Sequence, residues 1–234
     1  MDGNSRWAES RGLPAWVGHE RGVAALRAAV IAAQDWGIPA LTVYAFSLEN
    51  WQRDRSEVTF LMNLFQSALQ QQLPELQRNG VRLHFMGQLE LLPPGLQQQI
   101  AACSAATAGN SGLLLNVAVS YSAQHDMVGA VQRLAQRVQE GSLAPEQITP
   151  ALISHALSSA AVTAAVGPPD LLIRTSGEQR LSNFMLFEAA YTELCFLDCL
   201  WPDFDKQQFE AALQQYAQRQ RRYGKRQQQQ QQQQ

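Results

Sequence analysis

The sequence predicts an α/β fold in a single domain, with a mostly parallel central sheet flanked by helices. Segments of strand character alternate with segments of helical character along the whole chain. The strand segments are apolar at nearly every position, which is typical of parallel strands covered on both faces. The chain has 234 residues, 46% of them hydrophobic, which suits one large domain with a substantial core.

Apolar residues at helical spacing and terminal signals predict the helices. Residues 19–36 carry Val23, Leu26 and Val30 on one face and are followed by Gly37, a residue suited to ending a helix. Further helices are expected at 55–78, 94–107, 126–138, 183–190 and 205–221, and another opens at Thr149-Pro150.

Short apolar runs predict the strands, at 40–46, 81–86, 113–119, 170–174 and 193–197. Ligands of such sheets bind beyond the carboxyl ends of the strands. The segments that should carry function are therefore 47–53, 120–124 and 175–182.

Charge, hydropathy and cysteine content narrow the class of protein. The chain has 18 basic and 20 acidic residues, a net charge of -2, which argues against a general nucleic-acid binder. No apolar run is long enough to span a bilayer, so we expect a cytoplasmic protein that visits a membrane surface at most. The three cysteines, Cys103, Cys195 and Cys199, are an odd number, which argues against a disulfide framework and for a reducing compartment. No histidine has zinc-finger spacing to them, so we expect buried structural thiols.

The domain is expected to cover residues 1–226, followed by a disordered tail. Residues 227–234 are all glutamine and contain no apolar side chain to bury.

The first loop has features of an anion site. Asp2, the flexible Gly3 and Arg6 beside Trp7 stand close together, and His19 lies at the predicted start of the first long helix. Backbone N–H groups in such a loop and at a helix N-terminus favour phosphate. The alternative is an ordinary N-terminal loop.

Two loops after strands have matching chemistry. Segment 46–53 places Ser, Asn and Arg between two aromatic residues, and segment 174–183 contains Arg174, Arg180 and Ser182. Arginine pairs bidentately with phosphate oxygens, although surface ion pairs are the alternative. Glu193 together with Asp2 could hold one Mg²⁺. These residues suit a substrate with a diphosphate head and a hydrocarbon tail.

At this point the motifs resemble those of the cis-prenyltransferases, of which undecaprenyl diphosphate synthase is the bacterial example, and look most like the cyanobacterial branch. The matching segments follow one another over nearly the whole chain: MDGNSRWA, Gly12 to His19, LTVYAFSLENWQR, LLIRTSGEQRLSNF, AYTEL and LWPDFD.

The resemblance implies a homodimeric α/β enzyme with a hydrophobic tunnel. It would use Mg²⁺ to add isopentenyl diphosphate to an allylic diphosphate, such as farnesyl diphosphate, and would associate transiently with a membrane surface to release its product. Asp2 and Asn50 would be catalytic, with Asn50 orienting by hydrogen bonding rather than acting as a base, and Asp2 and Glu193 would hold the metal. Trp7 and Phe46 would line the prenyl path. The residues implied to bind the substrates are Gly3, Asn4, Ser5, Arg6, Trp7, His19, Ser47, Leu48, Glu49, Trp51, Arg53, Arg174, Arg180, Leu181 and Ser182.

The sequence departs from the family pattern at several positions. Ala15 replaces an arginine that would bind phosphate, segment 120–124 loses a glycine and an arginine, Asp54 replaces a proline and Phe187 a tryptophan. The family's first strand, which precedes the Asp2 loop, is also missing, so the start codon is set too late or the chain is a degraded paralogue. The alternatives to an active enzyme are therefore a weak or inactive paralogue that serves as a binding or regulatory subunit, and an unrelated phosphate-ligand binder.

Overall fold

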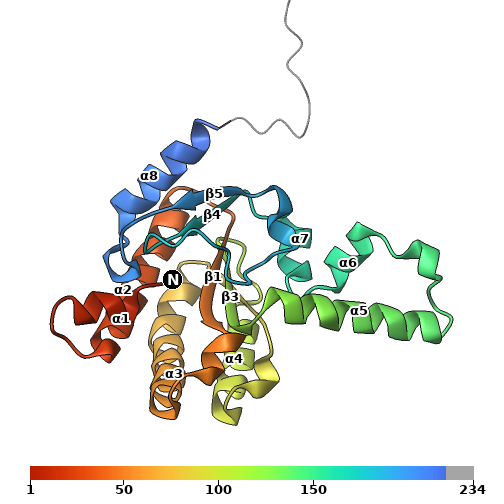
Figure 1. Cartoon of the computed structure of the whole chain (residues 1–234), viewed down its shortest axis with the longest axis horizontal. Coiled ribbons are helices and arrows are strands. Elements are labelled where there is room, and N and C mark those ends of the chain that lie inside the picture. The colour runs from red at the N-terminus through yellow and green to blue at the C-terminus, as the bar shows by residue number, and fades with distance from the viewer. Residues whose placement is uncertain (220–234) are drawn as a thin grey trace, which may run out of the picture.

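The computed structural model describes residues 1–219, which contain two parallel sheets (Figure 1). The larger sheet has the strand order β1-β3-β2, with β1 at Ala40–Ser47, β2 at Arg82–Met86 and β3 at Leu114–Tyr121. The smaller sheet pairs β4 (Leu171–Arg174) with β5 (Glu193–Phe196). The predicted α/β domain with parallel strands and flanking helices is confirmed.

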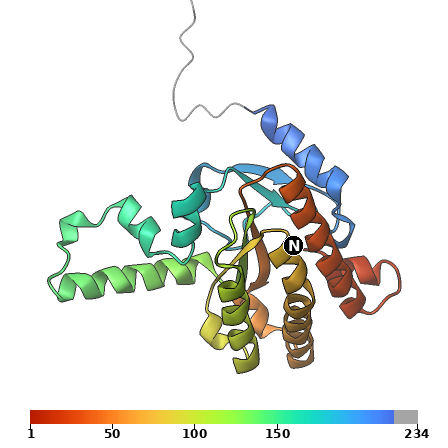
Figure 2. The same ribbon diagram turned by 180° about the vertical axis from the view of Figure 1, so that it is seen from behind.

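Three long helices pack on the larger sheet: α2 (Ala15–Asp35), α3 (Arg55–Arg78) and α4 (Pro94–Thr107). Figure 2 shows them from behind, with α8 (Lys206–Ala217) beside the smaller sheet. None of the helices within residues 1–219 is long and apolar enough to cross a membrane.

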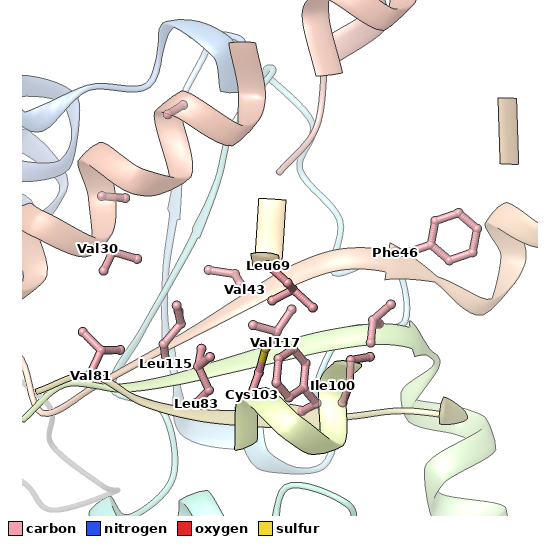
Figure 3. Packing of buried hydrophobic residues seen from close by; sticks show 14 of the residues in the cluster. Val30, Val43, Phe46, Leu69, Val81, Leu83, Ile100, Cys103, Leu115 and Val117 are labelled. Carbon is pink, nitrogen blue, oxygen red and sulfur yellow. The ribbon is translucent and has the colours of Figure 1, made fainter. Parts of the chain in front are cut away.

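The main core lies between these helices and one face of the larger sheet. Every residue of the central strand β3 is buried. Figure 3 shows Leu115 and Val117 from β3, Val43 from β1 and Val30 from α2 converging in this core. The next residue of β3, Ala118, belongs to a separate cluster, as expected for alternating side chains of a strand covered on both faces.

The two sheets are separated by a large cavity. Strand β1 pairs only with β3, and β4 only with β5, within the described residues. A cavity of about 1320 Å³ is lined by residues of both β1 and β4. The absence of a first strand stays a prediction. The cavity reaches the carboxyl ends of β1 and β4, where the sequence predicts the functional segments.

An arm formed by α5 (Ala123–Gln139) and α6 (Pro150–Ala156) extends away from the body in both views (Figures 1 and 2). Val128 and Val131 on α5 are among the most exposed large apolar residues of the described chain, at 53% and 57%. This arm presents apolar side chains without burying them.

The predicted helix at 183–190 is wrong. Asn183 and Met185 have positive φ angles of 60° and 46°, and only a short 3₁₀ turn forms at Glu188–Tyr191. The side chain of Asn183 donates hydrogen bonds to Glu49 and Ser122, and such contacts outweigh local helix propensity.

The chain termini also differ from prediction. Residues Asn4–Glu9 form a helix, α1, where a loop is predicted, and α2 begins at Ala15 rather than His19. The predicted helix 205–221 corresponds to α8, and its end and the glutamine tail 227–234 lie outside the described residues.

A buried carboxyl group anchors the segment before α7 (Ala160–Val166). Glu188 is 7% exposed and accepts a hydrogen bond from the hydroxyl of Ser159. Burial raises the pKa of the Glu188 carboxyl and the charge of Asp126 raises it further, although the Ser159 hydrogen bond opposes this shift. The folded protein therefore favours the protonated form of Glu188 more than the unfolded chain does.

We predict that Glu188→Gln flattens the dependence of stability on pH. Glu188 has a higher pKa in the folded than in the unfolded protein, so its protonation stabilises the fold fully below the unfolded-state pKa. Between the unfolded-state and folded-state pKa values, the free energy of unfolding falls by about 1.4 kcal/mol for each pH unit. The melting temperature of the native protein should fall from pH 5 to pH 8 relative to that of the variant. Parallel melting curves at the two pH values would contradict this.

Candidate active site

Most of the predicted site residues come together in the wall of the large cavity. Those present are Asp2, Gly3, Asn4, Ser5, Arg6, His19, Ser47, Glu49, Asn50, Arg53, Arg174, Arg180, Leu181 and Ser182. They come from the N-terminal loop and α1, from α2, and from the ends of β1 and β4 with the segments that follow them. The segments after β1 and β4 meet at this cavity, as expected for the carboxyl ends of parallel strands.

Arg174 is the most enclosed cation of the site. It is the last residue of β4, and its side chain is only 13% exposed. One guanidinium nitrogen, Nη1, donates to the Ser182 hydroxyl at 2.7 Å and to the carbonyl of Arg180. The other, Nη2, donates to Asp2 Oδ2 at 3.2 Å. These bonds hold the guanidinium in a single orientation at the cavity wall.

The Asp2 carboxylate is surrounded by donors. Its Oδ1 accepts a hydrogen bond from the Gly3 backbone N–H at 2.7 Å and lies 3.4 Å from Arg6 Nη2. Burial acts to raise the pKa of Asp2, but the Arg174 hydrogen bond, the Arg6 charge and the Gly3 N–H outweigh it and hold the pKa below its ordinary value. Asp2 is therefore an anion throughout the neutral range.

The backbone of Asp2 is fixed independently of its side chain. Its carbonyl oxygen accepts hydrogen bonds from the Ser176 hydroxyl at 2.6 Å and from the Trp201 N–H at 3.0 Å. Gly3 has a φ of 94°, and a Cβ there would collide with Ser176 Oγ. A glycine is thus required for the loop to approach the segment after β4 so closely.

Glu178 was not predicted as a site residue. Its two carboxylate oxygens pair with different arginines, Oε1 with Arg6 at 3.2 Å and Oε2 with Arg180. It therefore connects α1 to the segment after β4. The only sequence signal is its position two residues before Arg180, which is too common a pattern to single it out.

The loop after β1 is organised by its own hydrogen bonds. The Ser47 N–H donates to Asn50 Oδ1 at 3.0 Å, so the amide oxygen of Asn50 is already engaged. Glu49 accepts a hydrogen bond from Asn183 at 2.9 Å, which ties this loop to the segment after β4.

A second, apolar cavity of about 170 Å³ lies between α2 and α3. His19 lines both cavities, and its Nε2 is 3.5 Å from the Ser5 hydroxyl. Burial lowers the pKa of His19, which favours the neutral imidazole near pH 7. The residues shared by the two cavity walls are Met1, Asn4, His19, Ala45, Phe46 and Leu61.

Four predicted residues lie outside the walls of both cavities, and three of them are Trp7, Leu48 and Trp51. The Trp7 indole donates to Asp203 at 2.7 Å, so its place on the prenyl path stays a prediction, whereas Phe46 lines both cavities. The Trp51 indole donates to the Ser120 hydroxyl at 2.9 Å and supports the loop from behind.

The fourth predicted residue outside both cavities is Glu193. It begins β5 opposite Leu171, at the other end of the strand pair from Arg174, and its carboxylate accepts a hydrogen bond from Arg219 at 2.9 Å. The chain therefore does not bring the two predicted metal ligands together. The sequence already indicates this, because Glu193 is the first residue of its predicted strand and ligands bind beyond the carboxyl ends of parallel strands.

Comparison with known proteins identifies the family. A family model described as "Putative undecaprenyl diphosphate synthase" matches residues 1–224. The chain belongs to the undecaprenyl diphosphate synthase family.

Relatives in this family match over nearly the whole chain. A ditrans,polycis-undecaprenyl-diphosphate synthase of Shewanella oneidensis is 47% identical over 96% of this chain and 80% of its own length. A chloroplastic dehydrodolichyl diphosphate synthase of Solanum lycopersicum is 48% identical over 96% of this chain and 71% of its own. The crystal structure of lavandulyl diphosphate synthase from Lavandula x intermedia, in complex with dimethylallyl diphosphate, has a TM-score of 0.92 at 35% identity and covers 96% of this chain and 95% of that one.

The site of this family member fits a magnesium ion shared with a substrate. Mg²⁺ in proteins is usually held by one or two carboxylates, with phosphate oxygens and water as the other ligands. Asp2 supplies a carboxylate that is 40% exposed at the cavity wall. Residues 1–219 contain no cluster of three or more His, Cys, Asp or Glu side chains that could hold a metal without such help.

The close packing of α1 on α2 gives a prediction for this family member. A Cβ at Gly18 would collide with the backbone carbonyl of Asn4, so Gly18→Ala must displace α1 and with it the Asp2 loop. We expect at least a tenfold loss of activity. Gly95→Ala in α4 is the matched control, because its Cβ would meet only Gln66 Nε2 at 3.8 Å and alanine favours a helix by about 0.5–1 kcal/mol. Equal activities of the two variants would show that α1 can move without loss of activity.

Proposed function

We propose that this protein condenses isopentenyl diphosphate with an allylic diphosphate, such as farnesyl diphosphate, to give a cis-polyprenyl diphosphate. One observation carries the proposal: the Asp2–Arg174 pair lies in the wall of the large cavity, which shares His19 and Phe46 with the smaller apolar cavity. This combination suits a charged diphosphate joined to a hydrocarbon chain. The relatives reported above bear the names of diphosphate synthases, which favours the enzyme over a subunit without activity.

The two diphosphates are assigned to opposite sides of Asp2. Arg174, Arg180 and Ser182 lie together after β4 and would bind isopentenyl diphosphate, since arginine forks and hydroxyls donate to phosphate oxygens. Gly3, Asn4, Arg6 and His19 would bind the allylic diphosphate next to the apolar cavity. Arg180 and Arg6 both pair with Glu178 in this structure, so substrate oxygens would exchange for that carboxylate.

Asp2 would hold Mg²⁺ against the diphosphate oxygens. When bound, the ion neutralises charge that develops on the leaving diphosphate. Arg174 orients Asp2 through the 3.2 Å bond to Oδ2 and adds its own positive charge to the site. Glu193 is part of our metal prediction, but its contact with Arg219 favours a site in which Asp2 is the ligand from this chain.

In the reaction the allylic C–O bond breaks and the diphosphate leaves with the electron pair. The double bond of isopentenyl diphosphate attacks the allylic carbon, and positive charge remains on C3 of the isopentenyl unit. A proton then passes from C2 of this unit to a diphosphate oxygen, and the new double bond forms between C2 and C3. Asn50 is a poor candidate for the base, because an amide is neutral and its oxygen already accepts the Ser47 N–H. Its NH₂ group would instead orient a substrate. Holding both substrates in contact contributes several kcal/mol to lowering the barrier.

Assembly and location form a separate part of the proposal. The exposed Val128 and Val131 of the arm favour burial against a second copy, which makes a homodimer the expected assembly. The protein is expected in the cytoplasm, with transient contact to a membrane surface when an apolar product leaves.

Incubation of the purified protein with farnesyl diphosphate, labelled isopentenyl diphosphate and Mg²⁺ tests the proposal. Label should enter a product that extracts into butanol, and a chelator should prevent this. The absence of extractable label, from a folded protein that includes any segment encoded upstream, would favour the regulatory paralogue instead.

A further inference from the structure

The apolar cavity between α2 and α3 is small for the task that the proposed function gives it. Its volume is about 170 Å³, whereas pockets for drug-sized ligands measure about 300–1,000 Å³. Side chains such as Leu26, Leu61 and Leu69 line it from the two helices, and Val117 lines it from β3. A prenyl chain that grows into this space must therefore push α2 and α3 apart.

Two polar contacts join α2 to α3 along the wall of this cavity. Arg27 forms a forked ion pair with Glu75, in which Nε and Nη2 donate at 3.1 Å and 2.8 Å to Oε2 and Nη2 also donates at 2.9 Å to Oε1. The Gln34 side chain donates to the backbone carbonyl of Asn79 at 2.9 Å. All four residues belong to the cavity lining.

These contacts lie far from the diphosphate site. At about 1.5 Å per helical residue, Arg27 is about 12 Å and Gln34 about 22 Å along α2 from His19. A short prenyl chain that starts at His19 would stay clear of them, and a longer one would reach them. The contacts therefore oppose separation of α2 from α3 at a defined distance from His19.

The helix α3 contains a feature that permits such a separation. Pro74 lies inside α3, directly before Glu75, and has no N–H to donate to the carbonyl four residues earlier. Proline is a common cause of helix bending. The last turn of α3, which carries Glu75 and is followed directly by Asn79, can thus bend away from α2 more easily than the turns before it.

We propose that the Arg27–Glu75 ion pair is a latch that limits product length. This inference rests on the proposed function, because the latch acts on the prenyl product that the proposed reaction extends. While the pair is closed, it holds α2 against α3 and resists entry of further isoprene units. Its Arg27 side chain is 53% exposed, so water can solvate the separated ions and the latch can open without stranding a buried charge.

Product analysis of single variants and of a charge swap tests the latch. Arg27→Ala and Glu75→Ala should each shift the main product, measured by mass spectrometry, upward by at least one isoprene unit at an unchanged initial rate. The double variant Arg27→Glu with Glu75→Arg should restore the native product length. Lys206→Ala is the matched control, since it removes an ion pair of 2.8 Å with Asp35 that joins α8 to α2 outside the cavity.

The latch is refuted if both alanine variants of an active enzyme give the native product length or shorter products, or if the charge swap fails to restore it. A protein that makes no extractable product refutes the proposed function instead. In that case the latch hypothesis is tested by the affinity of the protein for geranylgeraniol, measured by tryptophan fluorescence. Arg27→Ala should bind this alcohol several-fold more tightly than the native protein, and equal affinities would refute the latch.

Discussion

Asp2→Asn should lower kcat about a thousandfold, because removing the metal-binding carboxylate costs several kcal/mol of transition-state stabilisation at about 1.4 kcal/mol per tenfold. The substitution keeps the shape of the side chain and an oxygen for the Gly3 N–H, which donates at 2.7 Å. It removes the negative charge that Arg174 and Arg6 surround. The measurement is the rate at saturating substrates over a range of Mg²⁺ concentrations.

The matched control for this variant is Asp35→Asn. Asp35 also pairs with a cation, Lys206 at 2.8 Å, but it is an exposed residue outside both cavities. An exposed pair contributes about 0–1 kcal/mol, so the control should retain native activity. An Asp2→Asn enzyme within a factor of ten of the native rate would exclude Asp2 as the metal ligand.

The second large effect is expected from Arg174→Lys, which should raise KM for isopentenyl diphosphate and lower kcat/KM roughly a hundredfold. Lysine keeps the charge but loses the planar fork that bonds Ser182 and the Arg180 carbonyl on one side and Asp2 on the other. Each hydrogen bond to a charged group is worth about 1.5–3 kcal/mol. Steady-state kinetics with each substrate varied in turn measure the loss.

Arg133→Lys provides the comparison. Arg133 also donates to a backbone carbonyl, that of Ala156, but it belongs to the arm and lies outside the cavity wall. Arg133→Lys should leave the KM values for isopentenyl diphosphate and farnesyl diphosphate unchanged. If Arg174→Lys raised KM for farnesyl diphosphate alone, the assignment of the two diphosphates to opposite sides of Asp2 would be reversed.

Most of the predicted site residues line one cavity because their placement follows from strand order. Arg174, Ser182 and Asn50 stand at or just after the ends of apolar runs, and parallel strands bring their carboxyl ends to one edge of each sheet. Helix α3 was also predictable, since its apolar stripe and the Asn79-Gly80 stop are local signals. Asp54, a departure from the family proline, accepts a hydrogen bond from the Ser56 N–H and caps this helix.

Features that depend on long-range contacts could not be predicted. The segment after Ser182 has helical composition, but hydrogen bonds from Asn183 to two other segments force it into turns with positive φ. The pairing of Glu178 with Arg6 joins residues far apart in sequence, and this contact leaves no signal in a single sequence.

The central claim is that Asp2 and Arg174 together bind a magnesium diphosphate. The most direct test is a crystal structure of the protein soaked with inorganic pyrophosphate and Mg²⁺. We expect pyrophosphate within hydrogen-bond distance of the Arg174 guanidinium and an Mg²⁺ ion between it and Asp2. Pyrophosphate bound elsewhere, with the 3.2 Å contact between Asp2 and Arg174 unchanged, would contradict the account.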